Sequence, residues 1–271
     1  MTRRDQRLAA WAGLMALAWA GGAQAGDGAR DFCADRPGKD TPACILDVGR
    51  VQFEMGLFDS THDRQAGVTT DTTDIGDLEL RFGLTPSMEA EVSWSPQVIQ
   101  RTHGGGTRER ISGSGDLTFG FRQSLRNPDG SGFSAAVQPF LTAPTGRKGI
   151  GAGAWGGGVI VPLTWQVSDA VGLGLTPEVD VVRDADGHGS HLAWTGVASA
   201  SRQVGAVTFA ADIWVSRDDD PSGHATQASF DVDAAWQPAS LKDMAFDVGV
   251  NTGLDHQTPD VEAYVGLARR F

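Results

Sequence analysis

The sequence predicts an all-β protein, a transmembrane, antiparallel, up-and-down β-barrel of about twelve strands. Apolar and polar side chains alternate with a period of two over most of the chain, short and long connections alternate between the predicted strands, and an apolar segment precedes them all. Because successive side chains of a strand point to opposite faces, each strand offers one face to lipid and the other to water.

The first 25 residues have the pattern of a cleaved secretion signal. Three arginines precede an apolar run over residues 8–20, and Ala23-Gln24-Ala25 is a small-x-small cleavage site. The run is shorter than the ~20 apolar residues of a transmembrane helix, so we expect cleavage rather than a retained anchor. Removal of residues 1–25 takes away three arginines and one aspartate, which changes the net charge from −12 to −14.

Residues 26–47 are expected to form a periplasmic leader that contains both cysteines, Cys33 and Cys44. An oxidising periplasm favours a disulfide between them, and two thiols without a nearby histidine do not make a metal site. The chain is acidic, with 34 Asp and Glu against 22 Lys and Arg. Nucleic acid is therefore not an expected partner, because affinity for it comes largely from neutralising phosphates.

Residues 48–271 are predicted to form the barrel. Residues 77–84 show the alternation most clearly, since every even position is apolar and every odd position is charged or glycine. A tilted strand of ~9–11 residues crosses a bilayer. The twelve predicted strands are 48–60, 74–85, 88–101, 114–125, 132–143, 155–166, 170–182, 191–202, 205–216, 227–237, 243–254 and 260–271.

The connections predict the topology of the barrel. Short periplasmic turns are expected at 85–87, 127–130, 167–169, 204–205 and 238–242, and longer outer loops at 61–73, 102–113, 145–154, 184–190, 217–226 and 255–259. All six histidines lie in the long connections or within a residue of them, as expected of loops in water. A soluble β-sandwich also alternates, but it has no reason to end on an aromatic residue.

The last residues resemble the C-terminal assembly signal of bacterial outer-membrane barrels. Tyr264, Gly266 and the final Phe271 fit this signal, whereas Arg269 stands where an apolar residue is usual. Its long side chain can reach the headgroups at a membrane edge. The resemblance implies recognition by the barrel assembly machinery and insertion among the lipids of a Gram-negative outer membrane.

Four further stretches resemble the family of outer-membrane transporters associated with the meta-pathway of phenol degradation. They are the run Gly115–Arg122, Pro139 with the closing 143–146 (Ala-Pro-Thr-Gly), the hairpin 80–86 and the closing 266–271. The likeness runs over most of residues 48–271. The resemblance implies that the permeant is a small molecule, with aromatic or apolar compounds among the candidates.

The face opposite the lipid is predicted to line a narrow lumen, since barrels of ~8 strands are filled by side chains and those of 16–18 are open. An acidic wall enriches cations, so an open pore should prefer cations or neutral solutes over anions. The carboxylates could instead only hydrate the wall, or form a network that closes the lumen. The candidate lumen residues are Asp77, Glu79, Arg81, Glu89, Glu91, Asp116, Arg122, Phe140, Glu178, Asp180, Asp212, Trp214, Asp231, Asp233, Asp247 and Glu262, with Arg202 and Arg270 as the other lumen cations.

The tryptophans predict two membrane interfaces. Trp155 and Trp194 lie near outer ends of predicted strands and Trp165 and Trp236 near inner ends, as in the aromatic belts of barrels. Trp214, together with Phe140, falls on the lumen side instead. These two residues are candidates for an apolar patch within the pore.

No catalytic residue, metal or cofactor is expected. Asp218–Asp220 with His224, and His188 with His191, match no defined metal-site spacing, and the glycine runs lack the Lys-Ser/Thr of a phosphate loop. A lipid hydrolase needs a serine and a histidine within hydrogen-bond reach, and no serine lies in a nucleophile motif. A structural or adhesive barrel would normally carry longer loops. The sequence therefore favours a passive channel.

Overall fold

All the strands pair antiparallel with their neighbours, and the last strand pairs with the first, which closes the sheet. The computed structural model describes residues 29–271, so the predicted signal peptide lies outside the described residues. Residues 30–270 belong to one unit. In the described part of the chain, no helix has the length and apolar character that crossing a membrane requires.

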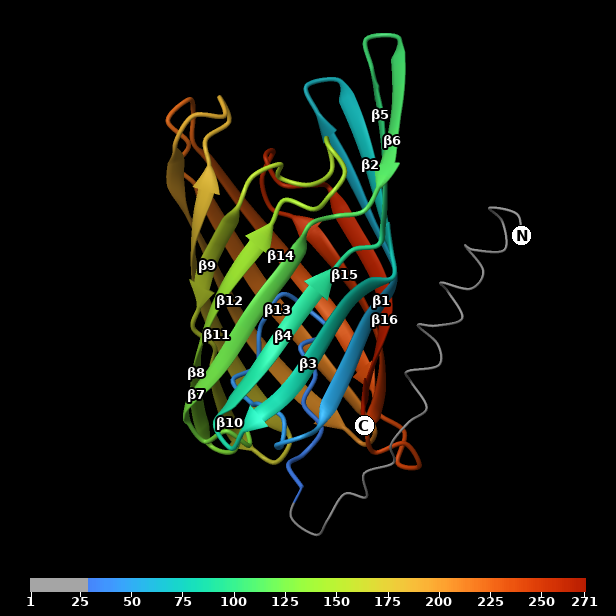
Figure 1. The fold of residues 1–271 in the computed structure, drawn as a ribbon. Helices are drawn as coiled ribbons and strands as arrows, with labels where there is room; N and C mark the ends of the chain where they lie inside the picture. Colours follow the sequence, from blue (N-terminus) through green and yellow to red (C-terminus); the bar gives the residue numbers. More distant parts are fainter. Residues whose placement is uncertain (1–28) are drawn as a thin grey trace, which may run out of the picture. The chain divides into compact units, whose positions relative to one another are not determined.

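The strand segments follow one another around the wall in chain order, with the exceptions explained below (Figure 1). Their bounds are β1 Val51–Gln65, β2 Val68–Ile75, β3 Asp77–Thr85, β4 Met88–Trp94, β5 Gln97–Gly104, β6 Thr107–Gly113, β7 Leu117–Arg126, β8 Phe133–Ala143, β9 Gly156–Ile160, β10 Leu163–Ser168, β11 Val171–Arg183, β12 Ser190–Val204, β13 Val207–Asp218, β14 Ala225–Trp236, β15 Met244–Gly253 and β16 Val261–Arg270.

The sixteen segments occupy twelve positions in the wall, because four pairs of consecutive segments share one position each. Segments β2 and β3 both pair with β1, and β9 and β10 both lie between β8 and β11. Similarly, β4 with β5 and β6 with β7 each form one interrupted strand. The closed twelve-stranded barrel predicted from the sequence is confirmed.

Two of these interruptions coincide with a proline. Pro162 separates β9 from β10 and Pro96 lies between β4 and β5. Proline has no N–H to donate to a neighbouring strand, so it breaks the ladder locally. The predicted strand at 155–166 is therefore present but split.

The first two outer loops were predicted wrongly. Residues 61–73 and 102–113 are mostly strand, and β1 and β2, like β5 and β6, turn over within two residues. Both residues of each turn, Ala66-Gly67 and Gly105-Gly106, have positive φ, which matches the twist of a tight hairpin. The alternation is weak here because both faces meet water above the membrane, while threonine still favours strand.

Apolar side chains cover the outside of the barrel and charged side chains fill the inside. On β7, Phe121 and Leu125 are 51% and 65% exposed, whereas Arg122 between them is 0% exposed. Trp155 and Trp165 are also more than half exposed on the outer surface. This inversion of an ordinary protein core is what a barrel in lipid requires.

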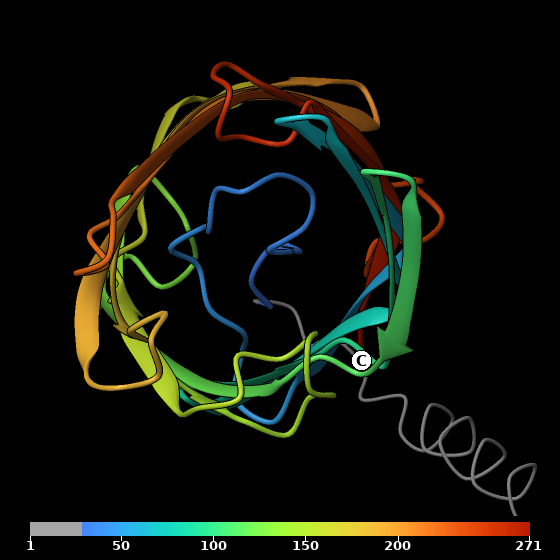
Figure 2. The same ribbon diagram turned by 90° about the horizontal axis from the view of Figure 1, so that it is seen from above.

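The N-terminal segment Arg30–Gly49, which we call the plug, lies inside the barrel (Figure 2). It was expected in the periplasm, and its described part instead crosses the lumen at the end that carries the short turns. There, Ile45 donates its N–H to the Pro128 carbonyl at 3.0 Å and Arg30 donates to the Pro86 carbonyl at 2.7 Å. Inside the lumen, the charged wall supplies the hydrogen-bond partners that the plug's backbone would otherwise find in water.

Candidate functional site

All sixteen predicted lumen residues are buried or partly buried. Arg202, by contrast, was wrongly placed in the lumen. It lies directly opposite Val171 and Phe209, and Phe209 is 53% exposed on the outer face. Arg270 lies inside and donates to the carbonyls of Arg30 and Asp31 in the plug.

Two wholly buried arginines bind one carboxylate of the plug. Arg81 and Arg122 are 0% exposed, and each has an Nη1 atom 2.9 Å from Oδ1 of Asp35. The wall supplies the remaining carboxylates, with Arg81 Nη2 2.7 Å from Glu89 and Arg122 Nη2 2.9 Å from Glu91. Asp35 therefore joins two arginines that the wall alone holds in place, and we call this contact the Asp35 latch.

The two guanidinium groups keep Asp35 ionised. Burial alone would raise the pKa of this carboxyl, but Arg122 and Arg81 outweigh it and hold the pKa below its usual value. A carboxyl with a depressed pKa stabilises the seated plug above its free pKa and loses this contribution as the pH falls through the lowered value. The latch is therefore intact at neutral pH.

The wall also satisfies the backbone of the plug, which has no secondary structure of its own. Arg81 donates to the carbonyls of Cys33 and Cys44 at 3.0 and 3.2 Å. Glu54, 0% exposed on β1, accepts the N–H groups of Asp35 and Arg36. A buried backbone requires such partners, so the plug and the wall fit each other chemically.

A second set of contacts joins the plug to β13, β15 and β16. Lys39 lies 3.0 Å from Glu262 and its ammonium is 5.3 Å from the centre of the Trp214 ring. Arg36 lies 3.0 Å from Asp247 and over the Tyr264 ring. A cavity of about 80 Å³ remains beside these residues, between the plug and the wall. Trp214 is thus covered by a cation rather than being open to the lumen.

Two residues of the predicted assembly signal also shape the lumen. Tyr264 is 8% exposed and its hydroxyl accepts the N–H of Gly38 at 3.0 Å. A Cβ atom at Gly266 would lie 2.5 Å from Nε of Arg36. Glycine at position 266 therefore leaves room for the Arg36 side chain. The contact of these residues with the plug is observed, whereas their role as an assembly signal stays a prediction.

Asp40 holds the plug against β11 and β12. Its carboxylate accepts the hydroxyls of Thr176 at 2.6 Å and Ser199 at 2.5 Å. Burial raises the pKa of Asp40, and these hydrogen bonds oppose the rise. The contact depends on Gly174, because a Cβ atom there would lie 2.0 Å from the Asp40 carboxylate.

Replacing Gly174 with alanine should therefore unseat the plug from this side. The added methyl group displaces Asp40, and overpacking of this kind costs about 1–3 kcal/mol, so the open probability in planar bilayers should rise about 10-fold. Gly196→Ala is the matched control on the neighbouring strand, because nothing lies within 4 Å of its Cβ position. Equal recordings from the two variants would contradict a role for Asp40.

The predicted disulfide between Cys33 and Cys44 is present. It closes the loop that contains Asp35 and Pro42, whose carbonyl accepts from Arg122 at 3.2 Å. The carbonyls of both cysteines are bound by the wall arginines as well. The bridge thus holds the latch loop in the shape that the wall recognises.

Reduction of this disulfide should loosen the plug. A closed loop of this length contributes about 3 kcal/mol by limiting the unfolded chain, and part of that should appear as a rise of about 10-fold in open probability. Channel recordings before and after addition of a thiol reductant measure the effect. The double variant C33S/C44S should already be open to the same extent and should not respond to the reductant.

Three of the residues that matter most here were not expected from the sequence. Gln52 and Glu54 lie inside the predicted strand 48–60 and alternate with apolar residues, so their pattern could have placed them in the lumen. Asp35 lies in an irregular segment, and no periodicity marks it. Only the folded barrel brings it to the two arginines.

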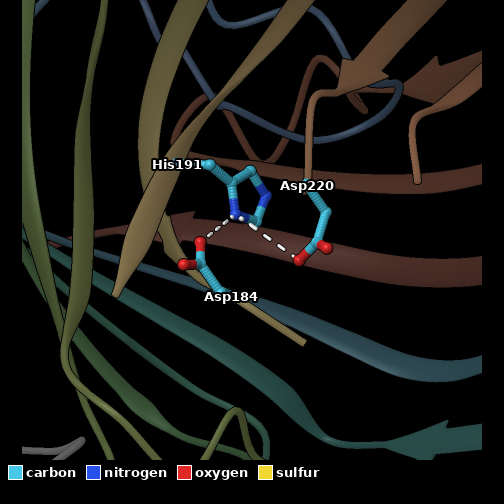
Figure 3. A group of neighbouring side chains, drawn as sticks. All are labelled: Asp184, His191 and Asp220. Atoms are coloured by element: carbon cyan, nitrogen blue, oxygen red, sulfur yellow. Dashed lines mark hydrogen bonds and ion pairs between the residues drawn. The ribbon is translucent and has the colours of Figure 1, made fainter. Parts of the chain in front are cut away.

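Two outer loops meet at His191, at the start of β12 (Figure 3). Its Nδ1 atom is 2.9 Å from Asp184 and 3.6 Å from Asp220, and its Nε2 atom is 2.8 Å from Asp218. Hydrogen bonds from Ser222 and from the N–H of Ala185 lower the pKa of Asp220 to about 2. Both ring nitrogens thus lie close to carboxylates, so His191 links the two loops.

The barrel is similar to solved structures at low sequence identity. These include the NanC porin (TM-score 0.51, 9% identity, 81% of this chain and 98% of that chain). They also include the β domain of the Bordetella autotransporter BrkA (TM-score 0.53, 11% identity, 83% and 100%) and the translocator domain of the autotransporter NalP from Neisseria meningitidis (TM-score 0.51, 13% identity, 83% and 89%). At such identities the likeness shows the fold alone.

No curated protein matches the sequence. One family model matches the sequence. It covers the plug from Ala34 onward together with the whole barrel wall. The match extends over residues 34–271. The chain therefore belongs to the family described as "Putative MetA-pathway of phenol degradation".

Proposed function

We propose that this protein is an outer-membrane channel for small molecules, aromatic or apolar compounds among them, and that the plug is its gate. The observation that carries the proposal is the chemistry of the plug's contacts. Although Ala43, Ile45 and Leu46 of the plug are buried, ion pairs and hydrogen bonds join the plug to the wall, and the Asp35 latch is the most buried of the ion pairs. Polar contacts of this kind can be exchanged for water when the segment moves, unlike an apolar core.

The substrate class rests on the family and on two aromatic residues expected to line the lumen. The family's description names phenol degradation. Phe140 and Trp214 are the aromatic residues expected on the lumen side, and once the plug is released Lys39 no longer covers Trp214, so an aromatic solute could stack there. Without the plug, the space that residues 30–49 fill would be available to a solute, since a twelve-stranded wall is wider than one of ~8 strands that side chains fill.

The unplugged lumen should select cations over anions. Most of the charged wall residues are carboxylates, and a wall of one sign enriches its counter-ions. In a variant with the plug released, the cation-to-anion permeability ratio should exceed roughly 5, measured from the reversal potential across a salt gradient. Adding D231N/D233N should lower this ratio, whereas D186N/D219N in the outer loops should leave it unchanged. A channel that prefers anions would overturn this prediction.

Liposome swelling tests the proposed function directly. Proteoliposomes are exposed in parallel to phenol, to a neutral sugar and to charged solutes, with the wild type and with the plug-released variant G174A. Faster entry of phenol and of cations through G174A than through the wild type is the expected result. The alternative function is a structural barrel that the plug closes permanently, and it is favoured by the full pairing of the latch. Absence of flux through every variant would favour that alternative.

A further inference from the structure

The first strands continue beyond the rest of the wall as a small sheet on the outer side (Figure 1). We call this the rim sheet, and it comprises residues 59–65 of β1, β2, β5 and β6. Residues directly opposite each other in paired strands share one face. The register therefore places two rows on one face, namely His62, Asp71, Arg101 and Arg110, and above them Arg64, Thr69, His103 and Arg108.

This face is the outward one. Asp59 lines the cavity inside the barrel, so alternate residues from it point inward and His62 points outward. The same outward face carries Phe58 and Ile75, which are 46% and 42% exposed at the top of the lipid-facing surface. Ile99 precedes Arg101 by two residues, or about 7 Å along β5. The two rows therefore begin where the apolar surface of the barrel ends.

Positive charge on this face is not balanced by the protein. Within residues 29–271, Arg101, Arg108 and Arg110 form no ion pair, although the chain as a whole has a net charge of −12. Arg101 and Arg110 are exposed and directly opposite each other, a placement of like charges that destabilises a sheet. The nearest carboxylate in the row, Asp71, already lies 2.6 Å from the ring of His62.

We propose that the outward face of the rim sheet binds phosphate groups of the lipid headgroups in the outer leaflet. Charge complementarity supports this partner, because a guanidinium binds phosphate through two parallel hydrogen bonds. The position of the two rows directly above the apolar surface supports it as well, since the acyl chains of the same lipid would lie on that surface. Long arginine side chains reach toward headgroups from a membrane edge. A phosphate between Arg101 and Arg110 would also remove their mutual repulsion.

Lipid titration of the full-length protein in a zwitterionic detergent tests this proposal. The probes are a bis-phosphorylated, multiply acylated glycolipid, the same lipid without phosphates, and inorganic phosphate, with bound lipid counted by native mass spectrometry. Two arginines near a membrane surface contribute enough that R101Q/R110Q should bind the phosphorylated lipid on the order of 30-fold more weakly. The control R126Q/R202Q removes two exposed arginines at the opposite end of the barrel and should bind like the wild type.

Each arm of the experiment has a defined meaning. Weaker binding by R101Q/R110Q alone, with loss of the difference at high salt, supports the proposal. Equal binding of the phosphorylated and dephosphorylated lipids, or equal binding by both variants, overturns it. Full competition by millimolar inorganic phosphate overturns the lipid assignment in favour of a free anion site. Heat-modifiable electrophoretic mobility verifies that every variant is folded.

Discussion

Asp35→Asn should raise the open probability of the channel on the order of 100-fold. The substitution leaves the shape of the side chain almost unchanged but removes the charge that both Arg81 and Arg122 share. Removing one partner of a buried ion pair typically costs 3–5 kcal/mol, and here the cost falls on the seated plug. Single-channel recording in planar bilayers at neutral pH measures the effect.

Asp31→Asn is the control for this variant. Asp31 belongs to the same plug and undergoes the same chemical change, but it is exposed. The open probability of the Asp31→Asn channel should match that of the wild type. If Asp35→Asn and Gly174→Ala were both as closed as Asp31→Asn, the plug would not be the gate and the structural alternative would stand.

Arg122→Gln should destabilise the whole barrel by about 3–5 kcal/mol. The arginine is 0% exposed and lies 2.9 Å from both Asp35 and Glu91, so its loss leaves the buried Glu91 without its ion-pair partner and Asp35 with Arg81 alone. Unfolding in guanidinium chloride, followed by tryptophan fluorescence of the protein in lipid, should show a clearly lower midpoint. The unfolding midpoint of Arg122→Lys should fall between those of the wild type and Arg122→Gln, because an ammonium keeps the charge but not the bidentate geometry.

Arg126→Gln is the matched control on the same strand. Arg126 is exposed and lies over the ring of Phe133 at 5.6 Å, a contact worth about 0.5–1 kcal/mol at an exposed site. A midpoint for Arg122→Gln no lower than that of Arg126→Gln would show that the buried network does not stabilise the barrel.

The wall of the barrel was predictable because lipid and water impose opposite demands on neighbouring residues. Every second residue of β7 must be apolar where it faces lipid, so the sequence alone indicates that Phe121 faces lipid and Arg122 faces the lumen. The signal disappears where both faces meet water. The rim sheet is therefore strand where loops were expected, and its unbalanced arginines could not be assigned to a face before the register of β5 and β6 was known.

By itself, the sequence determined the all-β class, the twelve wall positions and the pairing of Cys33 with Cys44. Only the tertiary structure decided that residues 30–49 occupy the lumen. The physical reason is that period-two alternation records a choice between two solvents, and most of the plug is shielded from both lipid and bulk water. Its partners are charges from strands far apart in sequence, such as Arg81, Arg122 and Glu262, which face the same segment only when the barrel closes.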